Sequence, residues 1–140
     1  MAIFIGVVML GSILGFALMQ TQPEGPVEVQ IPNVLDHQVT ADERVSVLKS
    51  GKTLIEYYYP ASCLECVEKK NLYESFVESK EISGYAVLAI SDAANETSDY
   101  ITGLNGDRLD LNEVNTSADL QKLFCSIALR QPTICILQEL

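Results

Sequence analysis

The sequence predicts an α/β domain, in which helices flank a mixed and mainly parallel sheet, preceded by a single N-terminal transmembrane helix. Two observations lead to this class. From residue 27 onward, strand-like apolar runs alternate with segments of helical periodicity, an order typical of parallel sheets covered on both faces. Residues 2–19 are almost entirely apolar and carry no charge. The chain of 140 residues is long enough for one domain beyond that segment.

The apolar segment 2–19 has the length of a membrane span, because a helix over it reaches roughly 27 Å at about 1.5 Å per residue. No basic residue precedes it, and residues 17–20 make a poor cleavage site. We therefore interpret residues 1–20 as an uncleaved anchor, with a removed signal peptide as the alternative. The first charges that follow, Glu24 and Glu28, are acidic, which favours an external location for the rest.

Composition points to the same location. The formal net charge of −10 argues against nucleic acid and anionic lipid head groups as partners. Four cysteines suit a compartment in which disulfides persist. Two sequons, at Asn95 and Asn115, predict N-glycosylation. We expect a single-pass membrane protein whose C-terminal domain is extracytoplasmic.

The first part of the external region divides into a linker and a strand–helix pair. Prolines and a glycine make residues 21–26 a linker, so the domain spans 27–140. Residues 27–31 alternate apolar and polar, as in a short strand. Thr40 and Glu43 form a capping box, which predicts a helix to about Ser50 with Val45 and Leu48 facing inward.

The remaining elements follow from periodicity and turn signals. Strands are expected at 53–59, 85–90 and 132–137, and the helical spacing of apolar residues after the cysteine pair predicts a helix that extends to about Lys80. The polar stretch 92–114 carries a type I′ hairpin signal at Asn105-Gly106. A last helix covers Leu120 to Ile127, with Thr116 or Ser117 as its N-cap.

Cys63 and Cys66 form a C-x-x-C pair where a buried strand gives way to a helix. In the first helical turn two such cysteines can close a small disulfide, and the free amides there stabilise a thiolate on Cys63. The alternatives are an inert cystine and half of a zinc site, for which Cys125, Cys135 and His37 are the other candidate ligands at unhelpful spacings. We expect no metal and no cofactor.

With these residues the sequence resembles the thioredoxin-like superfamily. Residues 54–66 (L-I-E-Y-Y-Y-P-A-S-C-L-E-C) look like the family's strand, loop and active-site helix, and residues 131–137 (Q-P-T-I-C-I-L) like its cis-proline segment. The resemblance implies that Cys63 attacks and Cys66 resolves. It also implies a cis bond before Pro132, facing the disulfide and holding substrate backbone. A trans proline that merely starts a strand is the alternative.

The same resemblance makes the chain look truncated. By that resemblance, the family's final antiparallel strand and last helix are missing, which would leave residues 134–137 as a bare apolar edge. Either the segment 98–112 or a partner chain would then cover that edge, and we favour a partner.

Two further site assignments concern Glu56 and the second cysteine pair. In the protein disulfide isomerase branch a glutamate near this place accepts the proton of the second cysteine. Glu56, if buried, would exchange protons with Cys66, and the alternative is a surface-facing glutamate. We favour a disulfide between Cys125 and Cys135, with two unpaired buried thiols as the alternative.

Taken together, these features predict a membrane-anchored, extracytoplasmic thiol–disulfide oxidoreductase that acts on protein thiols and disulfides through Cys63 and Cys66. The alternative is a redox-inert thioredoxin-fold accessory subunit of a membrane protein complex, similar to those of oligosaccharyltransferases. In that case the cysteines would be covered or permanently bridged, and the anchor would contact another protein.

Overall fold

The computed structural model describes residues 30–137. Its elements in chain order are β1 (Val34–Leu35), α2 (Ala41–Lys49), β2 (Thr53–Pro60), α3 (Cys66–Glu78), β3 (Ala86–Ser91), β4 (Ala93–Thr102), β5 (Arg108–Asp110), α4 (Ser117–Ile127) and α5 (Thr133–Ile136). Within this range, every helix is too short or too polar to traverse a bilayer. The predicted anchor at 1–20 and the linker at 21–26 lie outside the described residues.

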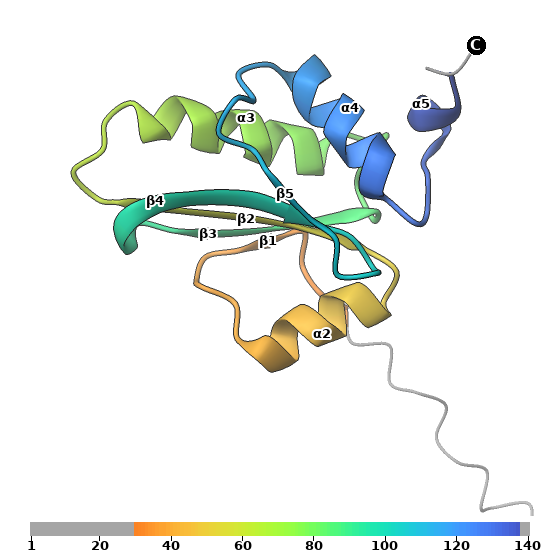
Figure 1. The fold of residues 1–140 in the computed structure, drawn as a ribbon, viewed down its shortest axis with the longest axis horizontal. Coiled ribbons are helices and arrows are strands. Elements are labelled where there is room, and N and C mark those ends of the chain that lie inside the picture. Colours follow the sequence, from red (N-terminus) through yellow and green to blue (C-terminus); the bar gives the residue numbers. More distant parts are fainter. Residues whose placement is uncertain (1–29, 138–140) are drawn as a thin grey trace, which may run out of the picture. The chain divides into compact units, whose positions relative to one another are not determined.

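The strands form one five-stranded sheet in the order β1-β3-β2-β4-β5. β1, β3 and β2 are parallel, whereas β4 runs antiparallel to β2 and β5 antiparallel to β4. Helices α3 and α4 lie on one face of the sheet and α2 on the other (Figure 1). The predicted class, a mixed sheet flanked by helices, is therefore confirmed.

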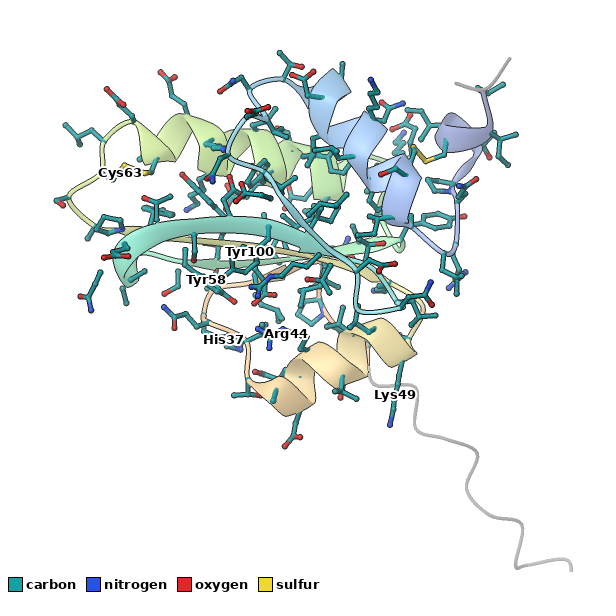
Figure 2. The ribbon with its side chains drawn as sticks, in the orientation of Figure 1. His37, Arg44, Lys49, Tyr58, Cys63 and Tyr100 are labelled. Atoms are coloured by element: carbon teal, nitrogen blue, oxygen red, sulfur yellow. A yellow bond between two sulfur atoms is a disulfide. The ribbon has the colours of Figure 1, made fainter. Side chains whose placement is uncertain are left out.

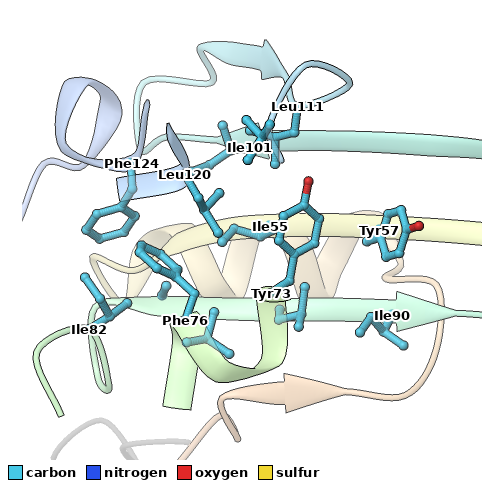
Figure 3. Close-up of a cluster of buried hydrophobic side chains, with 14 of the residues drawn as sticks. Ile55, Tyr57, Tyr73, Phe76, Ile82, Ile90, Ile101, Leu111, Leu120 and Phe124 are labelled. Atoms are coloured by element: carbon cyan, nitrogen blue, oxygen red, sulfur yellow. The ribbon is translucent and has the colours of Figure 1, made fainter. Parts of the chain in front are cut away.

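Strand β2 is buried along nearly its whole length because helices cover both of its faces. Alternate side chains point to opposite faces. Ile55 and Tyr57 belong to the larger core under α3 and α4, shown in Figure 3. Leu54 and Tyr58 belong to the smaller core together with Val47 of α2. This two-sided burial explains the continuous apolar and aromatic run in the sequence.

Helix α2 begins with the predicted capping box: the Thr40 hydroxyl accepts from the Glu43 amide, and the Glu43 carboxylate accepts from the Thr40 amide. The Glu43 carboxylate is hydrogen-bonded by the Thr40 backbone amide, and then by the His37 ring and the Thr40 hydroxyl, which together lower the pKa of Glu43 to about 2. The predicted inward face is wrong in one position, because Val45 is exposed and Val47 is buried. The helix is turned so that Arg44, at i−3 from Val47, also faces the sheet.

Two predicted strands are absent from their expected places. β1 lies after Pro32 rather than at residues 27–31, of which 27–29 are outside the described range. Residues 132–137 form no strand: Pro132 is the N-cap of the short helix α5. The β-branched and apolar character of this segment favours a strand locally, but Cys135 is bonded to α4 and held off the sheet edge.

The apparent truncation was consequently wrong. Antiparallel strands are present as β4 and β5, and a last long helix as α4. The outer edge is β5, a short strand with exposed Arg108 and Asp110, which is how natural sheets blunt an edge. Residues 134–137 therefore present no bare strand edge for a partner strand to cover, and the predicted partner at this place is wrong.

The hairpin between β4 and β5 occurs at the predicted place with a different turn. Gly106 has φ 81°, but Asn105 lacks the positive φ that a type I′ turn requires. The turn is longer, with the Gly103 amide donating to the Asp107 carbonyl at 2.9 Å. Gly103 is buried against the end of α4, where a Cβ would meet the Ile127 Cγ1 at 2.6 Å and its carbonyl oxygen at 2.7 Å.

Gly103→Ala should therefore destabilise the fold by about 1–3 kcal/mol, because the clash involves backbone that a rotamer change cannot relieve. Urea unfolding followed by circular dichroism measures the loss. Lys122→Ala, on the exposed side of α4, is the matched control and should stay within about 0.5 kcal/mol of wild type. Equal midpoints for Gly103→Ala and wild type would contradict this account of the packing.

Candidate functional site

Cys63 and Cys66 lie between the end of β2 and the start of α3. The chain turns after Pro60, whose carbonyl accepts the Cys63 amide at 2.9 Å, and α3 begins at Cys66. The two cysteines form a disulfide with their Cα atoms 5.4 Å apart. Cys63 is partly exposed, whereas Cys66 is 7% exposed. One half of the disulfide is therefore open to a partner and the other half is covered.

The N-terminus of α3 faces this disulfide, although Cys63 precedes the helix rather than lying in its first turn as predicted. Glu65 occupies the N-cap position, and its side chain makes no capping hydrogen bond. The first amides of α3 thus lack a side-chain acceptor, and the positive end of the helix dipole lies beside the sulfurs. This arrangement favours a thiolate on Cys63 once the bond is reduced.

A cavity of about 370 Å³ opens beside the disulfide. Its walls come from β2, α3, β4 and the loop before α4, and they comprise Tyr57, Cys63, Glu65, Cys66, Glu68, Lys69, Leu72, Thr97, Val114 and Asn115. Thr97 and Val114 were not predicted to belong to this site, because only the fold brings β4 and the later loop next to the cysteines.

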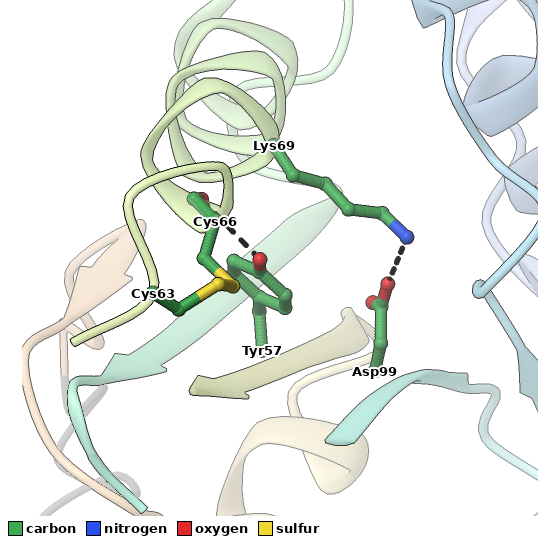
Figure 4. Close-up of a disulfide and its surroundings, with 5 residues drawn as sticks. All are labelled: Tyr57, Cys63, Cys66, Lys69 and Asp99. Carbon is green, nitrogen blue, oxygen red and sulfur yellow. Dashed lines mark hydrogen bonds and ion pairs between the residues drawn. A yellow bond between two sulfur atoms is a disulfide. The ribbon is translucent and has the colours of Figure 1, made fainter. Parts of the chain in front are cut away.

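Behind the cavity lies a buried carboxylate that sequence reasoning missed. Asp99 of β4 is 2% exposed; its Oδ2 accepts from Tyr73 at 2.8 Å and pairs with Lys69 at 2.5 Å (Figure 4). Its Oδ1 has no partner among the described residues. Burial raises the pKa of Asp99, and the bonds from Lys69 and Tyr73 oppose that rise only in part.

Tyr57 connects this group to the disulfide. It is the β-sheet neighbour of Asp99, and its hydroxyl donates to the Cys66 carbonyl at 3.3 Å. Burial, followed by the nearby Asp99, raises the pKa of Tyr57 to about 12. The tyrosine is therefore a neutral donor at physiological pH that helps to fix the backbone of Cys66.

Glu56 is buried, with 0% exposure, but it faces the opposite side of the sheet. Arg44 of α2 contacts both its oxygens, Nη2 to Oε1 at 2.6 Å and Nε to Oε2 at 3.2 Å, and the Tyr58 hydroxyl donates to Oε1 at 3.1 Å. Figure 2 shows Arg44 on the α2 side of the sheet and Cys63 on the α3 side. The predicted proton exchange between Glu56 and Cys66 is therefore wrong.

Pro132 does not face the Cys63–Cys66 disulfide. No peptide bond among residues 30–137 is cis, so the predicted cis bond before Pro132 is also wrong. Pro132 lies near Lys80 and Glu81, beyond the far end of α3. Its expected role at the cysteines required a strand at residues 132–137, where the structure has α5.

The other sequence-assigned residues lie apart from this centre or at its edge. Cys125 and Cys135 form a second disulfide, the favoured pairing, with Cα atoms 5.3 Å apart. Asn95 and Asn115 are exposed, as an acceptor for a glycan must be, and their glycosylation stays a prediction. His37 pairs with Glu43 at 2.9 Å. No group of three metal-ligating side chains comes together between residues 30 and 137.

Comparison with known proteins gives few matches. No family model matches the chain, and no curated protein matches it. Among solved structures, it is similar to the first thioredoxin domain of mouse protein disulfide-isomerase A4, with 14% identity and a TM-score of 0.42, covering 74% of this chain and 79% of that one.

The fold assignment rests on the architecture of the chain itself. A buried strand leads through a loop to a helix that begins at the C-x-x-C pair, and the sheet ends on antiparallel strands followed by a last helix. The sequence resemblance implied the strand, the loop and the helix at the C-x-x-C pair, whereas the closing antiparallel strands and the last helix are the part that it wrongly suggested was missing. The chain has a thioredoxin-like fold.

The raised pKa of Asp99 predicts how stability depends on pH. Its unfolded-state pKa is about 3.9 and its folded-state pKa is higher, so the folded form binds the proton more tightly. The contribution of Asp99 to the free energy of unfolding is fully present below about pH 4, and it is lost as the pH rises through the folded-state pKa. The free energy of unfolding of wild type relative to Asp99→Asn should therefore fall as pH rises from about 4.

Urea unfolding of both proteins at a series of pH values measures this difference. Asp107→Asn, on the exposed hairpin turn, is the control for removal of one acidic charge. A difference that grows with pH would show that Lys69 and Tyr73 dominate over burial and would reverse the assignment.

Proposed function

We propose that this protein is a thiol–disulfide oxidoreductase that acts on protein thiols through Cys63 and Cys66. The observation that carries the proposal is the asymmetry of the disulfide at the start of α3. Cys63 is partly exposed beside a cavity, and Cys66 is buried against Tyr57. Thiol–disulfide exchange needs one cysteine that can contact the substrate, here Cys63, and a second that contacts only the first, here Cys66.

The exchange balances with the two cysteines alone. In the reduced protein, the Cys63 thiolate attacks one sulfur of a substrate disulfide, and the substrate S–S bond breaks to release one substrate thiolate. The Cys66 thiolate then attacks Cys63 Sγ, which closes the Cys63–Cys66 bond and releases the second substrate thiolate. Two electrons pass from the protein to the substrate, and the reverse sequence oxidises a substrate dithiol.

The proton of Cys66 needs an acceptor for the second step. Asp99 supports this role better than Glu56, because it lies on the cysteine side of the sheet and pairs with Lys69, which lines the same cavity as Cys66. Its pKa is raised by burial, and its Oδ1 is unbonded among the described residues. A raised pKa makes the Asp99 carboxylate a stronger base than an ordinary aspartate, as a proton acceptor requires.

After mild reduction, Cys63 should be alkylated at least tenfold faster than Cys66, because it is more exposed and lies at the positive end of α3. Mass spectrometry of peptides that separate the two cysteines measures both rates. Cys66→Ser should accumulate a mixed disulfide with substrate through Cys63, whereas Cys63→Ser should not. Equal or reversed alkylation rates would contradict the assigned roles.

We also propose that the domain is held on the outer side of a membrane by residues 1–20. The apolar segment 2–19, the exposed sequon asparagines and the two disulfides support this location. The protein should stay in the membrane fraction after carbonate washing, and added protease should reach the domain in intact cells. A mature N-terminus near Thr21 would overturn the anchor and leave the external location standing.

A redox-inert accessory subunit remains the second candidate. Exposed apolar side chains near the second disulfide favour it, because Leu129, Ile136 and Leu137 are each more than half exposed, as at a partner contact. The reduction potential of Cys63–Cys66 separates the two functions. A pair that glutathione buffers reduce and reoxidise supports exchange, whereas a pair that resists reduction in the folded protein supports the accessory role.

A further inference from the structure

Charge at the cavity beside Cys63 is distributed unevenly. Glu65 and Glu68 line the cavity, and both are exposed. Among the described residues, Lys69 is the only cation in the lining, and it is paired with Asp99. Among residues 30–137, neither glutamate has a cationic partner within ion-pair distance. The mouth of the cavity therefore carries negative charge that the described part of the protein does not neutralise.

The rest of the lining is neutral and suits a peptide segment. Leu72 and Val114 provide apolar surface, and Thr97 provides an uncharged polar group. A volume of about 370 Å³ holds only a few side chains, so it fits the residues next to a substrate cysteine rather than a folded domain.

From this arrangement we infer that the site selects cysteine-containing peptide segments in which basic residues flank the reactive cysteine. The inference rests on the proposed exchange activity and names its substrate class. Glu65 lies between the two cysteines, and Glu68 lies in the first turn of α3, so both carboxylates border the place where a substrate sulfur must approach Cys63. Lys or Arg beside that sulfur is attracted, and Asp or Glu is repelled.

This charge preference changes the rate at which the peptide associates with the site more than the rate at which Cys63 attacks the disulfide. Both carboxylates are exposed, so their field reaches about one Debye length, roughly 8 Å at physiological salt and about 3 Å at 1 M. Charge-directed association changes rates by about tenfold or more at low salt. The preference should therefore be large at low ionic strength and small at high ionic strength.

The test uses the reduced full-length protein and three synthetic disulfide peptides that differ only in the residues beside the cysteine: Lys, Ser or Glu. Rates are divided by those of the same peptides with dithiothreitol, because a flanking charge alters the intrinsic reactivity of a disulfide. At low salt the Lys peptide should react at least tenfold faster than the Glu peptide. That ratio should approach one at about 1 M salt.

Two double variants locate the effect. Glu65→Gln with Glu68→Gln should reduce the Lys-to-Glu rate ratio at least severalfold, and the ratio within one variant cancels any change in Cys63 reactivity. Glu78→Gln with Glu81→Gln removes the same charge at the far end of α3 and should leave the ratio as in wild type.

Similar rates for the three peptides, or an equal fall of the ratio in both double variants, would overturn the inference while the exchange activity stands. Failure of every peptide to react with wild type would overturn the proposed function together with the inference. A Lys preference that only the Glu65 and Glu68 variant removes supports both.

Discussion

The site and the fold both depend on β2 being buried on its two faces at once. Because side chains alternate along this strand, neighbouring residues serve different layers. Tyr57 packs toward α3 and donates to the Cys66 carbonyl, whereas Glu56 faces α2 and pairs with Arg44. The end of the same strand determines where the chain leaves the sheet, and hence where Cys63 meets the N-terminus of α3. A shift of one residue in this strand would exchange the two layers.

Between residues 30 and 137, each face of the sheet buries one carboxylate, and the surroundings of the two differ. Glu56 has partners for both oxygens, from Arg44 and Tyr58, as expected of a buried ion pair that holds a helix on a sheet. Asp99 has a partner for only one of its oxygens among the described residues, and its pKa is raised. An unsatisfied buried acceptor costs about 1–3 kcal/mol. Such a cost is typical of a functional site, and it falls on the face that carries the cysteines.

Local sequence signals predicted most elements correctly. The capping box at Thr40, the apolar run of β2 and the helical stripe of α4 each have one strong local cause. The strand predicted at residues 132–137 was wrong. Its β-branched and apolar residues favour a strand, whereas the disulfide from Cys135 to Cys125 and the proline support a short helix. Asp99 was not predicted as a site residue because β4 has one exposed face and a mostly polar sequence, in which a buried aspartate does not stand out. The face of the sheet toward which Glu56 points depends on how the strands pair and which helix covers each face. No local sequence pattern shows this.

The acidic border of the cavity also bears on the reactivity of the cysteine. The N-terminus of α3 favours a thiolate on Cys63, and the nearby charges of Glu65 and Glu68 oppose it. A basic side chain bound beside the two glutamates would offset their charge at the moment when the substrate sulfur arrives. Binding of a basic substrate and activation of Cys63 would then have the same physical cause. The free protein would hold Cys63 in a less reactive state, and a basic substrate would itself promote the thiolate that attacks it.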